Sequence, residues 1–131
     1  MIKVSVAKVA RRWNPFQESL WPRLDRPITR EEIDACPDEE ELPKIDKVRE
    51  GLWDLSSREN HIRRVAWLAR HWSNAYPIGI DVGVDMPGHQ EFYVLDGNHR
   101  LAAAIYLKRK WIPANVDGDV KWIEAIRWHG R

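Results

Sequence analysis

The sequence contains little cysteine and no long apolar stretch. Cys36 is the only cysteine among 131 residues, which excludes an internal disulfide and a cysteine-rich zinc site. No uncharged apolar run approaches the roughly 20 residues that span a bilayer. The first residues also lack the apolar block of a signal peptide. We therefore expect a cytoplasmic protein that makes no membrane contact.

An excess of charge of one sign is also missing. The formal net charge is +1, so no overall basic field attracts the chain to nucleic acid. The charges are unevenly spread, because residues 37–41 are strongly acidic whereas one predicted helix carries Arg58, Arg63, Arg64 and Arg70. These arginines could contact the phosphates of DNA or RNA. They could equally form the solvated face of the helix or pair with the acidic stretch.

The chain has the length of one domain, and 44% of its residues are hydrophobic. Its character changes near Ser56, since residues 1–55 hold five of the eight prolines and show only short, interrupted patterns. Trp13, Trp21 and Trp53 lie in this irregular extension. They could form a surface for a protein partner or for stacking bases. Burial in the core is the commoner fate of aromatic residues.

Local signals predict a few elements in the extension. Residues 2–6 alternate as in a strand, and residues 13–27 contain three prolines, which indicates an extended loop. Residues 29–32 have the form of a capping box, which predicts a helix that stops before Pro37. A second helix is predicted at about residues 44–52.

The rest of the chain has more regular patterns. Residues 56–59 form another capping box that ends in Glu59, and the helix behind it has an apolar face of Ile62, Val65, Ala66, Ala69 and Trp72. Two strands at 78–84 and 91–95, joined by a turn at 87–90, predict a hairpin.

The second of these strands leads directly into Asp96-Gly97 and then into a helix that ends near Lys108. A short strand at 114–116 follows, closed by an Asp-Gly turn. Residues 120–128 are apolar at mixed spacing, which leaves strand and helix both open. Together these elements predict an α+β fold.

The order of strand, Asp96, Gly97 and helix suits the binding of an anion. The first turn of a helix has amide groups without partners in the helix, at the positive end of its dipole. Gly97 would let a phosphate approach the backbone, and Arg100 could hold phosphate oxygens. His99 could transfer a proton, and Asp96 could act as a base or bind Mg²⁺. An ordinary tight turn would explain the same residues.

Residues 96–104, Asp-Gly-Asn-His-Arg-Leu-Ala-Ala-Ala, resemble the signature of the ParB/sulfiredoxin superfamily, in which a "G-x-x-R" turn opens a helix. The resemblance extends over about residues 56–116, through the preceding helix, the "P-I" strand and the later "I-P" step. It implies a small mixed sheet packed with helices. In this view residues 1–131 are a single ParB/sulfiredoxin-like domain, with residues 1–55 as an amino-terminal extension and 117–131 as a carboxyl-terminal element.

The resemblance also implies nucleotide chemistry. Members of the superfamily bind ATP or CTP, with Mg²⁺, against the "G-x-x-R" turn. Partition proteins hydrolyse CTP while clamping DNA, sulfiredoxins transfer phosphate from ATP to a sulfinic acid, and related enzymes phosphorylate free serine. Carried over, the phosphate-binding residues would be Gly97, Asn98, His99 and Arg100, with Arg58 close by, and the catalytic residues would be Asp96, His99 and Glu59.

Differences between this sequence and the superfamily signature exclude some of the activities found in the superfamily. Asn98 occupies the place of the sulfiredoxin cysteine, so sulfinic acid repair is not expected. Partition proteins continue into further DNA-binding and dimerisation regions, so plasmid partitioning is not expected either. The "D-G-x-H-R" turn is closest to the free serine kinase-like branch. His61, His71, His89 and His129 lack metal-ligand spacing, and no protein metal site is predicted.

We therefore expect a nucleotide-binding NTPase or phosphotransferase. One alternative is a DNA-binding or ParB-like nuclease module. Another is a catalytically inactive, protein-binding domain of a phage or mobile element, which would use its tryptophan-rich half to grip a protein partner.

Overall fold

The computed structural model describes residues 1–44, 56–84 and 91–130. In chain order the elements are β1 (Ile2–Ser5), α1 (Val6–Ala10), α2 (Arg30–Ala35), α3 (Arg58–Arg70), β2 (Ile78–Asp81), β3 (Tyr93–Asp96), α4 (Asn98–Tyr106), β4 (Trp111–Asp117) and α5 (Val120–Ile126). Among the described residues, no helix is both long and apolar enough to cross a membrane.

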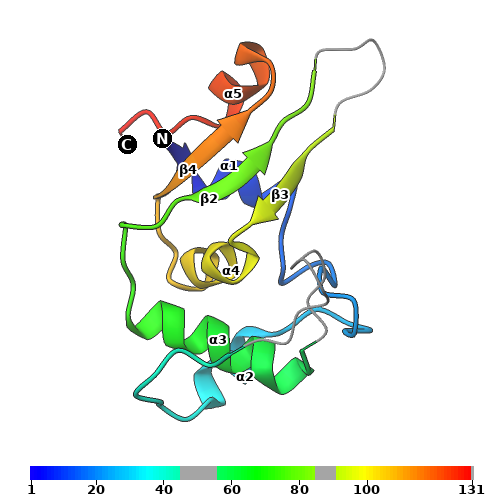
Figure 1. The fold of residues 1–131 in the computed structure, drawn as a ribbon, viewed down its shortest axis with the longest axis vertical. Helices are drawn as coiled ribbons and strands as arrows, with labels where there is room; N and C mark the ends of the chain where they lie inside the picture. Colours follow the sequence, from blue (N-terminus) through cyan, green and yellow to red (C-terminus); the bar gives the residue numbers. More distant parts are fainter. Residues whose placement is uncertain (45–55, 85–90, 131) are drawn as a thin grey trace.

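Four strands form one mixed sheet in the order β1-β4-β2-β3 (Figure 1). β4 pairs antiparallel with β1 and parallel with β2, and β3 pairs antiparallel with β2 at the edge of the sheet. The predicted α+β class and its small mixed sheet with packed helices are therefore confirmed. The predicted hairpin strands are indeed neighbours, although the turn predicted at 87–90 falls outside the described residues.

Helix α4 lies between the sheet and α3 (Figure 1). Leu101 and Ala104 belong to the core formed with the strands, and Ala102 and Ala103 belong to a second core formed with α2 and α3. All four side chains are fully buried. A helix with two buried faces needs apolar residues all round rather than along one stripe, which explains the unbroken run of four. This packing fixes where the first turn of α4 lies.

The amino-terminal extension contributes to the second core. Trp21, Leu24 and Ile28 are buried there against α2, α3 and α4. The interpretation of Trp21 as a core residue is therefore confirmed, while Trp13 is half-buried and Trp53 lies outside the described residues.

The helix caps agree with one sequence prediction and contradict another. Thr29 and Glu32 form the predicted capping box at the start of α2. The box predicted at residues 56–59 is wrong, because α3 is capped by Ser57, whose side chain accepts from the Asn60 amide, and Ser56 is buried. Only Ser56 has a glutamate three residues further on, so the local pattern favoured it, but the helix begins one residue later. Glu59 therefore has no capping role.

Other boundaries differ from the predictions for local reasons. The strand predicted at 78–84 ends at Asp81, whose side chain accepts from the Gly83 amide and turns the chain away. Val84 is consequently exposed rather than packed beside Ile80. β4 is longer than predicted, α1 was not predicted, and the ambiguous tail is helix α5. The helix predicted at 44–52 falls almost entirely outside the described residues.

Candidate functional site

The turn at residues 96–100 connects the edge strand β3 to α4. Gly97 is the N-cap residue of α4 and has a φ of 88°, in the left-handed region that side chains disfavour. A Cβ atom at this position would lie 2.5 Å from Cγ2 of Ile78 in β2. Glycine is therefore required here for two reasons, the backbone angle and the close approach of the neighbouring strand.

The first turn of α4 receives no side-chain cap from the described residues. Asn98, the first residue of α4, uses its side chain elsewhere. Its Oδ1 accepts from Nε1 of Trp13 at 2.7 Å, and its Nδ2 donates to the carbonyl of Val94 at 3.2 Å. Among the described residues, the positive end of this helix thus has no carboxylate or hydroxyl cap, as a site for an external anion requires.

Arg100 lies in the same turn, half-buried, with its guanidinium 5.3 Å from the centre of the Tyr76 ring. Partial burial lowers the pKa of Arg100, while the Asp96 carboxylate and Tyr76 act in the opposite direction. A guanidinium stays positive at neutral pH despite such a shift. Within the described ranges no carboxylate lies at ion-pair distance from it. Arg100 is therefore a partly desolvated cation that an anion could neutralise.

A cavity of about 330 Å³ opens beside Arg100 and is lined mainly by aromatic side chains. Trp67 of α3 stacks on His71, the C-cap residue of the same helix, with ring centres 4.2 Å apart. Trp72 and Tyr76 form further parts of the lining. One cation at the edge of an aromatic cavity suits a ligand that has both a planar ring and a negative group.

His99 does not line this cavity. Its side chain is only 8% exposed, and its Nε2 atom lies 2.7 Å from Nδ1 of His61, which is fully buried on α3. The indole of Trp21 stacks on both imidazole rings. The spacing of the histidines in the sequence indicated no function for His61. Its position four residues before Val65, on the apolar face of the helix, was a signal that it is buried.

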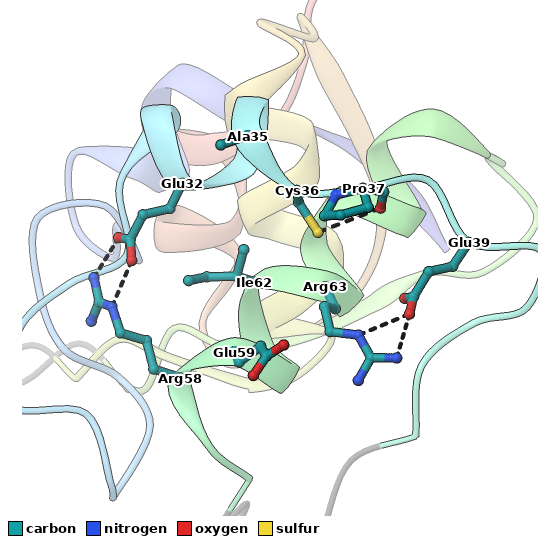
Figure 2. A pocket seen from close by; sticks show the side chains of 9 residues that line it. All are labelled: Glu32, Ala35, Cys36, Pro37, Glu39, Arg58, Glu59, Ile62 and Arg63. Carbon is teal, nitrogen blue, oxygen red and sulfur yellow. Dashed lines mark hydrogen bonds and ion pairs between the residues drawn. The ribbon is translucent and has the colours of Figure 1, made fainter.

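Arg58 and Glu59 are not placed with Arg100 either. Both line a separate cavity of about 670 Å³ between α2 and α3 (Figure 2). Nε and Nη2 of Arg58 donate to the two carboxylate oxygens of Glu32 at 2.8 and 2.5 Å, and Nη2 also donates to the carbonyl of Pro27. Arg58 therefore forms an internal ion pair with Glu32. Glu59 is exposed and lies between this pair and the pair of Arg63 with Glu39 (Figure 2).

Other arginines of α3 are also paired. Arg63 binds Glu39, and Arg70 lies 2.9 Å from Asp38. The interpretation that this strip pairs with the acidic stretch at 37–41 is thus confirmed for these two residues. Burial raises the pKa of Cys36, which lines the larger cavity, and so disfavours its reactive thiolate form.

The Arg58–Glu32 pair gives a pH-dependent prediction. The hydrogen bonds from Arg58 lower the pKa of Glu32 from 4.5 to about 2. A carboxylate with a depressed pKa stabilises the fold above its unfolded value, and this contribution disappears as the pH falls from about 4.5 to about 2. We expect E32Q to lower the free energy of unfolding by about 1 kcal/mol at pH 7, because water reaches both side chains and weakens the pair.

Urea denaturation of wild type and E32Q between pH 7 and pH 2 measures this difference. Glutamine keeps an oxygen for the capping box, so the variant tests the charge. E31Q on the same turn of α2 is the matched control, with an expected change of a few tenths of a kcal/mol. A difference between wild type and E32Q that stays constant down to pH 2 would contradict the assignment.

The described residues contain no group of three histidine, cysteine, aspartate or glutamate side chains that could hold a metal ion. Asp96 is exposed at the end of β3, next to the first turn of α4. A carboxylate there could contribute one ligand to Mg²⁺ that arrives with phosphate groups, which is how Mg²⁺ is usually held.

Comparison of the chain with models of protein families, with characterised proteins and with solved structures gave no match. The fold and the site define the chain as an α+β protein with a four-strand mixed sheet packed against helices.

Proposed function

We propose that the chain binds a nucleoside triphosphate, ATP or CTP, at the 96–100 turn and acts as an NTPase or phosphotransferase with a ParB/sulfiredoxin-like fold. The proposal rests on three features that occur together at this turn. The start of α4 has no side-chain cap among the described residues, Gly97 presses against Ile78, and Arg100 stands beside an aromatic cavity.

The phosphates would lie at the first turn of α4, where backbone amides and the helix dipole favour negative charge. Arg100 would hold phosphate oxygens with its planar fork of donors. The base would enter the cavity lined by Trp67, Trp72 and Tyr76. Its volume of about 330 Å³ lies within the usual range for small-molecule sites. Stacking on aromatic rings binds any base through its π-face.

Asp96 would supply the chemistry of the turn. Mg²⁺ bound with the nucleotide would neutralise charge on the phosphates. Because Asp96 is exposed next to Arg100, its carboxylate could orient the attacking water or acceptor hydroxyl and accept its proton. Catalysis would then consist mainly of positioning and charge stabilisation.

Calorimetric titration of the chain with the four ribonucleoside triphosphates and Mg²⁺ tests this proposal. Inorganic tripolyphosphate lacks the base and adenosine lacks the phosphates, so the two probes separate the parts of the site. We expect at least one triphosphate to bind more tightly than either probe and to raise the melting temperature by mass action. The proposal fails if no triphosphate produces heat or a thermal shift at millimolar concentration.

A further inference from the structure

One residue of the 96–100 turn, His99, belongs to a cluster of three stacked rings. His61 of α3 and His99 of α4 are 0% and 8% exposed, with their rings 15° from parallel. The indole of Trp21 lies over both, with ring centres 4.5 Å from His61 and 4.7 Å from His99. The cluster therefore joins the amino-terminal extension, α3 and the first turn of α4.

The contact between the two imidazoles constrains His99 closely. Nδ1 of His61 and Nε2 of His99 are 2.7 Å apart, a distance at which one nitrogen must carry the proton and the other must accept it. Whichever ring donates, the bond restricts the tautomers of both rings and the orientation of the His99 side chain. Stacking against the Trp21 indole also restricts the tilt of the His99 ring.

Asn98, the neighbour of His99 in the turn, is also bound by a residue of the amino-terminal extension. Nε1 of Trp13 donates to Oδ1 of Asn98 at 2.7 Å, and the Trp13 ring also makes an edge contact with Tyr93 of β3. Two consecutive residues of the turn are thus tethered by side chains that come from other elements. Neither tether occupies the cavity that Arg100 lines.

From this geometry we infer that His61, Trp21 and Trp13 are positioning residues for ligand binding at the 96–100 turn. They fix the side chains of Asn98 and His99, and so hold the backbone amides of the first turn and the adjacent Arg100 in the arrangement that receives phosphate. The inference rests on the proposed function, and it gives the amino-terminal extension a role in that function. A binding turn displaced by even about 1 Å loses much of its affinity.

The experiment compares variants of the full chain in two readouts. H61F keeps a ring under Trp21 but removes the hydrogen bond to His99. H61N places an amide near the position of Nδ1 and can restore the bond. W13F removes the donor to Asn98 and keeps a smaller aromatic ring near Tyr93. I126A, which creates a cavity on α5 away from the turn, is the control for a general loss of stability.

The first readout needs no ligand. Hydrogen exchange followed by NMR should be faster for the amides of Asn98, His99 and Arg100 in H61F and W13F, and near wild type in H61N and I126A. The imidazole nitrogen spectrum of wild type should show one N–H shared between two histidines, and H61F should lack it. Unchanged exchange in H61F and in W13F would overturn the inference.

The second readout is affinity for the best-bound triphosphate and for tripolyphosphate. We expect about a tenfold loss in H61F and W13F, the equivalent of one hydrogen bond, with partial recovery in H61N and no loss in I126A. An affinity loss in I126A equal to that in H61F would overturn the inference. If wild type binds no phosphate compound, the proposed function fails, and hydrogen exchange alone still decides whether these residues position the turn. If H61F does not fold, W13F carries both readouts.

Discussion

Replacing Gly97 with alanine is expected to lower the free energy of unfolding by about 2–5 kcal/mol. Two costs add at this position. The backbone has a φ of 88°, where an L-residue costs about 1–2 kcal/mol. The new Cβ would also meet Cγ2 of Ile78 at 2.5 Å, and forcing a methyl group into a packed interior costs about 1–3 kcal/mol. Ile78 is fully buried in the central strand β2, so it has little freedom to move away.

Gly130 provides a matched control for this prediction. Its φ of 82° is close to that of Gly97, but a Cβ at Gly130 would meet nothing within 4 Å. G130A therefore reports the backbone cost alone, about 1–2 kcal/mol. Urea denaturation of the two variants measures the difference. Equal effects would show that the contact with Ile78 contributes nothing.

Replacing Arg100 with glutamine is expected to weaken nucleoside triphosphate binding by about 10- to 100-fold. Charge-assisted hydrogen bonds to phosphate are worth about 1.5–3 kcal/mol, which corresponds to this range of affinity. Because the guanidinium has no carboxylate partner among the described residues and contacts the face of Tyr76, its removal should change stability by less than about 1 kcal/mol. Calorimetric titration and urea denaturation measure the two effects separately.

Arg30 is the matched control at the opposite end of α4. Its guanidinium donates to the carbonyls of Ile105 and Tyr106 in the last turn of the helix. R30Q removes the same charge from the same helix but leaves the 96–100 turn intact. We expect R30Q to bind triphosphate as wild type does. Equal losses of affinity in R30Q and R100Q would show that net charge, and not the position of Arg100, governs binding.

The features that the sequence predicted well depend on neighbours in the chain. The capping box of Thr29 and Glu32 spans three residues, and the strand-to-helix junction at Gly97 follows from the local order of residue types. Leu101, Ala104 and Ile105 also indicated a helix, although the burial of this helix on both sides became visible only with the packing of α3 and the sheet. Residues close together in the sequence determine such elements, so they can be predicted from the sequence.

The features that it missed depend on residues far apart in the chain. His61 and His99 are separated by 38 positions, and Arg58 and Glu32 by 26. Arg58 was a reasonable phosphate ligand by residue type, but the structure places it in a pair with Glu32 at another cavity. Trp21 has no periodic pattern around it that would indicate a place over two imidazoles. Tertiary packing alone brings these side chains together.

The position of α4 between two cores also bears on the kinetics of association. A helix that is clamped on both sides cannot shift without disturbing the sheet and α3 together, so its first turn is already ordered before any ligand arrives. A preformed turn of this kind needs no rearrangement of α4 before it binds. Stopped-flow traces should therefore show one phase whose rate rises linearly with ligand concentration and does not level off.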